Sequence, residues 1–213
     1  MDSNSATRVV LPGETVSGQP MAMPGCYVSN GKTVASVISL MRDGKLIPLK
    51  GQYLPTTGDY VVGIVVEERF SGYSIELHSP YPGTISSRET RYQFKTGDLV
   101  SAQIAEVNEI NEAILVDERP LGVGTIIEVD YVKVPRIIGR NGSMLEMIKQ
   151  YTGTDLFVGK NGRIFLRGGN IALASQAILK INSEAHIAGL TDRIKDFLEK
   201  ETGGVKPEMP EMV

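Results

Sequence analysis

The chain has 213 residues, of which 41% are hydrophobic and 22% charged, and its net charge is −3. This composition is typical of a folded globular protein, and no stretch approaches the ~18 consecutive apolar residues that a membrane helix needs. The first ten residues lack the basic and apolar regions of a secretory signal, and the single cysteine, Cys26, cannot form an internal disulfide. We therefore expect a cytoplasmic protein that has no membrane partner.

Residues 1–52 are predicted to form a small all-β module with a net charge of +2. Strand-like segments lie on both sides of Asn30-Gly31 and of Asp43-Gly44. These dipeptides supply the positive φ angles that tight hairpins need, so they indicate short antiparallel strands.

Residues 58–125 are predicted to form a five-stranded OB-type β-barrel, preceded by a Pro/Gly/Thr linker at residues 52–58. Five strand-like segments follow one another with no long helical pattern between them: Asp59–Val66, Tyr73–Leu77, Thr84–Ser86, Leu99–Asn108 and Ala113–Asp117. Five short strands in one small domain suit an OB barrel. Residues 53–128 carry a net charge of −7, which argues against strong RNA binding by this domain alone.

Residues 126–201 show a mixed α/β pattern. The predicted elements are a strand at Ile126–Val134, a helix at Ser143–Tyr151, a hairpin of Thr154–Val158 and Arg163–Arg167 around Gly159–Gly162, and a long helix from Ile171 to Ala185. Gly189 interrupts this helix, and Thr191 is predicted to cap a second helical segment that ends near Lys200. Residues 202–213 contain two glycines and two prolines, so we expect a disordered tail.

A glycine-rich loop, Gly139-Arg140-Asn141-Gly142, lies between a short apolar turn and the start of a predicted helix. Two glycines let the main chain approach a phosphate closely, and the following helix N-terminus favours negative charge. Arg140 and the nearby Arg136 add mobile cations. The loop and the order of elements around it resemble a type I KH domain, whose GXXG loop clamps about four nucleotides. Contact with protein instead of RNA stays open for this loop.

The middle domain resembles an S1 motif in Gly58–Val65, Gly72–Leu77, Pro82–Ser86 and Thr96–Val100. S1 and other OB folds bind single strands by stacking bases on aromatic rings along a basic groove. The resemblance places stacking rings at Phe70 and Tyr73, and the alternative is that both are packing residues. The candidate phosphate contacts are Arg88, Arg91 and Lys95, and Thr84 stands where many S1 domains carry a histidine.

The order of a small β module, S1 and KH resembles the archaeal exosome cap subunit of the ribosomal RNA-processing protein four family. That family's KH loop is typically Gly-X-Asn-Gly, and Val9–Gly13 and Pro24-Gly25 also match its pattern. The resemblance implies a non-catalytic subunit, present in three copies on a hexameric RNase-PH-like ring. Residues 1–52 would dock on the ring, and the cap would pass the 3′ end of single-stranded, poly(A)-rich RNA into it.

No catalytic or metal-binding constellation stands out, so we expect neither enzymatic activity nor a cofactor. His78 and His186 are isolated, and one cysteine cannot build a zinc-type cluster. The alternatives are a free-standing S1/KH accessory factor in transcription or translation, and a structural subunit that never contacts RNA. A fragment of polynucleotide phosphorylase is disfavoured because those enzymes carry KH before S1. Arg140→Asp or Gly139→Asp is expected to weaken RNA capture without unfolding the chain.

Overall fold

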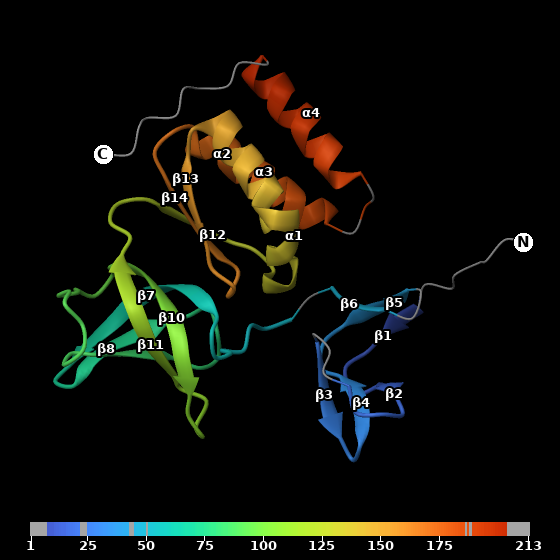
Figure 1. The fold of residues 1–213 in the computed structure, drawn as a ribbon, viewed down its shortest axis with the longest axis horizontal. Coiled ribbons are helices and arrows are strands. Elements are labelled where there is room, and N and C mark those ends of the chain that lie inside the picture. Colours follow the sequence, from blue (N-terminus) through green and yellow to red (C-terminus); the bar gives the residue numbers. More distant parts are fainter. Residues whose placement is uncertain are drawn as a thin grey trace, which may run out of the picture. The chain divides into compact units, whose positions relative to one another are not determined.

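A computed structural model describes residues 8–21, 25–42, 45–49, 51–185, 187 and 189–203. The chain divides into two compact units, Met1–Gln52 and Tyr53–Val213 (Figure 1). The second unit contains a closed barrel and a three-stranded sheet with four α-helices. Within the described residues, the helices are too short or too polar to cross a membrane.

The first unit is all β, as predicted. Its strands are β1 (Arg8–Val10), β2 (Thr15–Ser17), β3 (Cys26–Ser29), β4 (Lys32–Ala35), β5 (Ser39–Arg42) and β6 (Lys45–Pro48). They form two three-stranded sheets, ordered β1-β5-β6 and β2-β4-β3. Asn30 and Gly31 have φ angles of 49° and 73°, which confirms the predicted β3–β4 turn. Asp43-Gly44 and Pro24 lie outside the described residues.

The second unit begins with the predicted five-stranded barrel. Its strands are β7 (Tyr60–Arg69), β8 (Gly72–Glu76), β9 (Gly83–Ser86), β10 (Leu99–Val107) and β11 (Ala113–Pro120). The barrel closes in the order β10-β11-β9-β8-β7, and only the β9–β11 pairing is parallel. Alternate residues of β7, such as Val61 and Val65, point into the barrel core, as expected from the two-residue period of a strand.

A KH domain completes the second unit. Its elements are β12 (Thr125–Glu128), α1 (Val134–Ile138), α2 (Ser143–Thr152), β13 (Asp155–Val158), β14 (Arg163–Arg167), α3 (Ile171–Glu184) and α4 (Leu190–Thr202). The sheet order is β12-β14-β13, and the helices pack on one face of it around a core that includes Ile148, Ile164 and Ile178 (Figure 1). Short 3₁₀ turns at Tyr131–Lys133 and Arg140–Gly142 precede and follow α1.

Two predicted boundaries are wrong. The strand predicted at Ile126–Val134 ends at Glu128, and Val134 begins α1, because Pro135 lies in the first turn, where a missing N–H is tolerated. Thr191 does not cap α4, because the helix already begins at Leu190 after Gly189 in a left-handed conformation. The helix also continues to Thr202, two residues beyond Lys200. The rest of the predicted tail, residues 204–213, lies outside the described residues.

Candidate nucleic-acid interface

The GXXG loop begins with a glycine that no other residue could replace without strain. Gly139 has a φ of 76°, and its N–H donates to the carbonyl oxygen of Pro135 at 3.0 Å, which ends α1. A Cβ at this position would lie 2.7 Å from the backbone nitrogen of Met144. Gly139 therefore lets the chain turn tightly from α1 into α2.

The other end of the loop is open. Asn141 and Gly142 have φ angles of 52° and 78°, and a Cβ on Gly142 would meet no heavy atom within 4 Å. The α2 helix begins at the next residue and has no side-chain cap, although the Ser143 N–H donates to the carbonyl oxygen of Arg140. The positive end of the helix dipole favours an anionic ligand there. Arg136 and Arg140 are exposed, and neither forms an ion pair with any part of the chain that the structure describes.

A second group of predicted site residues gathers at one end of the barrel. Phe70 lies in the β7–β8 turn and is fully exposed. The Ser87 N–H donates to the carbonyl oxygen of Ser71 at 3.0 Å, which holds the start of the long β9–β10 loop beside this turn. The exposed cations Arg88, Arg91 and Lys95 all lie in that loop. The structure thus places the exposed Phe70 ring beside the start of the loop that carries these cations.

Tyr73 is separated from this group because it points into the barrel. Its side chain is 7% exposed and packs edge-on against Phe94, with ring centroids 5.4 Å apart. The structure therefore supports the packing interpretation for Tyr73 and leaves Phe70 as the exposed ring of the pair. Thr84 donates to a Glu112 carboxylate oxygen at 2.5 Å, so a carboxylate lies beside Thr84.

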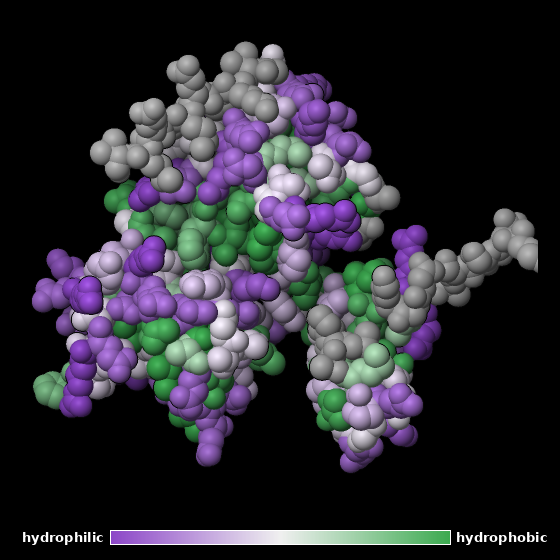
Figure 2. Space-filling model, in the orientation of Figure 1, coloured by the Kyte–Doolittle hydropathy of each residue, from purple (hydrophilic) through white to green (hydrophobic). Residues whose placement is uncertain are grey.

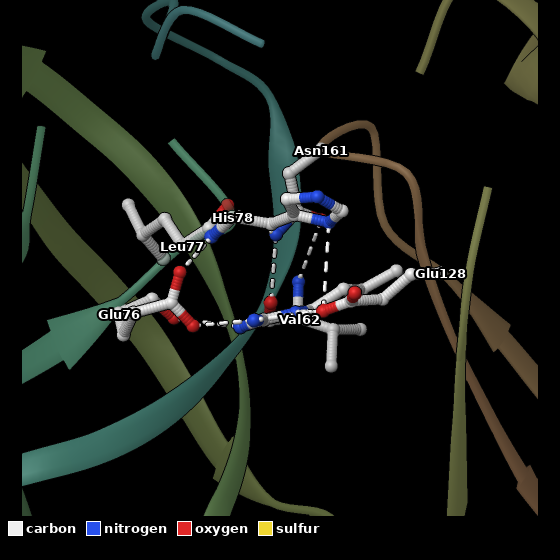
Figure 3. A network of polar contacts seen from close by, with 7 residues as sticks. Val62, Glu76, Leu77, His78, Glu128 and Asn161 are labelled. Carbon is white, nitrogen blue, oxygen red and sulfur yellow. Dashed lines mark hydrogen bonds and ion pairs between the residues drawn. The ribbon is translucent and has the colours of Figure 1, made fainter. Parts of the chain in front are cut away.

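A functional residue that the sequence interpretation missed is Asn161, in the β13–β14 turn. Only 1% of this residue is exposed. Its side-chain Nδ2 donates to the carbonyl oxygens of Val62 at 2.7 Å and Leu77 at 2.8 Å, and its Oδ1 accepts from the Val62 N–H at 3.2 Å (Figure 3). The amide thus pairs with Val62 of β7, beyond the residues that β8 pairs with, and with Leu77 just after β8, so it fixes the KH domain to the barrel. The signal was a second Gly-X-Asn-Gly tetrapeptide at residues 159–162.

An ion-pair cluster lies beside Asn161 (Figure 3). Arg163 is 5% exposed and pairs with Glu76 of the barrel and with Glu128 of the KH domain, whose Oε1 is 3.0 Å from its Nε. A third bond runs from Arg163 Nη1 to the carbonyl oxygen of Glu76 at 3.0 Å. His78 Nδ1 lies 3.6 Å from the same Glu128 oxygen. These contacts connect three strands from two domains, so the barrel and the KH domain are joined by specific polar bonds.

The linker contributes an aromatic contact to this unit. Tyr53 packs edge-on against Tyr131 with ring centroids 5.8 Å apart, and its hydroxyl donates to Asp59 at 2.8 Å. Burial, and then the hydrogen bond to Asp59, raise the pKa of the Tyr53 phenol far above its usual range. Tyr53 therefore stays neutral and serves as a packing residue. His186 lies outside the described residues, and the described ones contain no acidic, histidine or cysteine cluster suited to a metal.

Comparisons with known proteins point in one direction. The chain is 37% identical to the exosome complex component Rrp4 of Methanopyrus kandleri, over 91% of this chain and 94% of that protein. The Rrp4 proteins of Thermofilum pendens and Thermococcus kodakarensis are 38% and 33% identical, over 91% and 96% of this chain and 93% and 91% of theirs. A solved structure described as a candidate exosome complex RNA-binding protein superimposes with a TM-score of 0.65 at 31% identity, covering 71% of this chain and 97% of that one. No protein-family model matches.

Proposed function

Because the chain belongs to the Rrp4 family of exosome complex components, we propose that it is a non-catalytic RNA-binding cap subunit of the exosome. It captures single-stranded, poly(A)-rich RNA and guides its 3′ end to the RNase subunits for 3′-to-5′ degradation and processing. The observation that carries this proposal is the open GXXG loop with its exposed arginines, in a chain similar to Rrp4 proteins along most of its length. Family membership favours this function over a free-standing accessory factor.

The first unit is proposed to dock on a hexameric RNase-PH-like ring, in three copies per complex in the cytoplasm. Among the described residues, its core cluster has the buried members Val10, Ala35 and Leu46, with Val16, Cys26 and Met41 packed against them, so it is small for an independently stable domain. Many of its large apolar side chains are instead exposed: Val9, Leu11, Met21, Tyr27, Val28, Ile38 and Ile47. Hydrophobic residues are visible on the surface of this unit in Figure 2. Exposed apolar surface of this kind supports a protein-docking role.

RNA contact is proposed at two places in the second unit. The first is the loop of Gly139, Arg140, Asn141 and Gly142 with Arg136, where a helix N-terminus and exposed cations suit a phosphate backbone. The second is the barrel end with Phe70 and the basic loop, where a base can stack beside phosphate contacts. Each site offers few contacts by itself, so three copies acting together would supply the avidity.

The proposal is tested by purifying the tagged chain from its native cell and identifying its partners by mass spectrometry. RNA degradation by the purified material is then measured with and without phosphate. We expect RNase-ring subunits to co-purify with phosphate-dependent degradation, and the chain alone to degrade nothing. RNA-bound chain without ring subunits would instead establish the free-standing factor, and degradation by the chain alone would contradict the non-catalytic role.

A further inference from the structure

The junction between the barrel and the KH domain presents an aromatic residue and a lysine side by side. Tyr60 is the first residue of β7, and Lys160 lies in the β13–β14 turn. The Lys160 N–H donates to the carbonyl oxygen of Tyr60 at 2.8 Å. Because this bond joins main-chain atoms, the two residues stay adjacent whatever their side chains contact.

Tyr60 lies at the rim of the covered part of the barrel. Tyr60 and Val62 are two residues apart on β7, so both side chains emerge on the outer face, while Val61 points into the core. Val62 is fully buried beneath the turn that carries Asn161, whereas Tyr60 is 50% exposed. Half of Tyr60 is therefore open to solvent beside this covered part of the barrel.

Lys160 is an available cation in a basic segment. Residues 129–167 carry a net charge of +4, but several of their cations are engaged: Lys133 with Asp130, and Arg167 with Asp155. Lys160 is exposed and forms no ion pair with the described residues. Its neighbour Asn161 is held by three hydrogen bonds, so the turn is already ordered and loses little entropy on binding a ligand.

We propose that Tyr60 and Lys160 form a further contact site for single-stranded RNA, in which a base stacks on the Tyr60 ring and the Lys160 ammonium pairs with an adjacent phosphate. A ring together with a free cation is the combination by which proteins hold single strands without reading sequence. The surroundings favour RNA over a protein partner, because Tyr60 faces the polar Gln103 across the β7–β10 ladder. This site rests on the RNA-binding function proposed above and adds a contact where the barrel meets the KH domain.

The test uses the full chain and a fluorescently labelled oligoadenylate, with affinity measured by anisotropy over a range of salt concentrations. We expect Tyr60→Ala to weaken binding about tenfold, as the loss of one base–aromatic stack predicts, and Tyr60→Trp to restore it. Lys160→Ala should lower the slope of log affinity against log salt by about 0.7, the value for one single-strand phosphate contact.

The matched control is Lys32→Ala. Lys32 is also exposed and also follows a glycine in a hairpin turn, but it belongs to the first unit. This change should not alter RNA affinity. Normal RNA binding by Tyr60→Ala and Lys160→Ala, at unchanged urea midpoints, would overturn the site alone. Loss of ring-subunit binding by Tyr60→Ala at normal RNA affinity would reassign Tyr60 to a protein contact. A wild-type chain that binds no RNA, alone or in the complex, would overturn both this site and the proposed function.

Discussion

Two tetrapeptides of the same pattern, Gly-X-Asn-Gly, lie twenty residues apart in this chain and occupy opposite environments. In the first, at residues 139–142, the asparagine is exposed and the last glycine has open space around it. In the second, at residues 159–162, Asn161 is buried with three hydrogen bonds, and a Cβ on Gly162 would lie 2.3 Å from the carbonyl oxygen of Val129. The pattern therefore specifies a tight turn, and its neighbours decide whether that turn is free to bind a ligand.

The elements on either side explain the difference. The first tetrapeptide joins two helices and lies at the N-terminus of α2, where the helix dipole favours an anionic ligand. The second joins two strands and meets Tyr60–Val62, a part of β7 that β8 leaves unpaired. Buried backbone groups require partners, so the second turn is committed to the barrel while the first remains available.

The largest expected effect comes from removing the buried amide. Asn161→Ala would leave the N–H and C=O of Val62 and the C=O of Leu77 without their partner. We expect the free energy of unfolding to fall by about 3 kcal/mol, measured by urea denaturation. Asn141→Gly is the matched control, because glycine accepts the φ of 52° and the Asn141 side chain is exposed. Similar losses in the two variants would mean that Asn161 does not join the domains.

The last glycine of each tetrapeptide gives a second comparison. Gly162→Ala combines a φ of 82° with a clash against Val129, so we expect a loss of about 2–3 kcal/mol in unfolding free energy. Gly142→Ala has the same unfavourable φ but open space, so we expect about 1 kcal/mol. Thermal or urea unfolding of the two variants measures the difference. Equal losses would show that the clash with Val129 adds nothing to the backbone strain that the two variants share.

Charge reversal in the open GXXG loop should lower the affinity for RNA and leave the stability of the fold unchanged. We expect Arg140→Glu to weaken RNA binding about fivefold through repulsion of the phosphates, with an unchanged urea midpoint. Lys200→Glu, at an exposed position on α4, makes the same change in net charge away from the loop. If these two variants bind RNA with equal affinity, the GXXG loop does not contact RNA, and a protein contact is the remaining interpretation. Gly142→Asp is preferable to Gly139→Asp as a second variant, because the clash with Met144 makes Gly139→Asp destabilising, contrary to the sequence-based expectation.

The smallest expected effect concerns the basic loop at the barrel end. Replacing Arg88, Arg91 and Lys95 by alanine should lower the salt slope of RNA binding by about 2, as three single-strand phosphate contacts predict. Stability should not change, because all three side chains are exposed. Titrations at several salt concentrations measure the slope, and an unaltered slope would remove this loop from the RNA site.

The sequence by itself determined the order of modules, the closed five-stranded barrel and the KH domain, because these depend on strand and helix periods and on local turn residues. Asn30-Gly31 is an example, since both positive φ angles follow from the residue types. The sequence also identified the GXXG loop, because its glycines and arginines lie next to one another in the chain.

Tertiary structure alone decided which polar and aromatic residues are buried. Phe70 and Tyr73 lie three positions apart, yet one is fully exposed and the other lies in the barrel core, because Phe70 lies in the β7–β8 turn and Tyr73 lies in β8. Asn161 and Arg163 connect the KH domain to the barrel by hydrogen bonds. Their partners, Val62, Leu77 and Glu76, are distant in the chain. Local patterns carry no record of such pairings, because a long-range hydrogen bond exists only once the chain has folded.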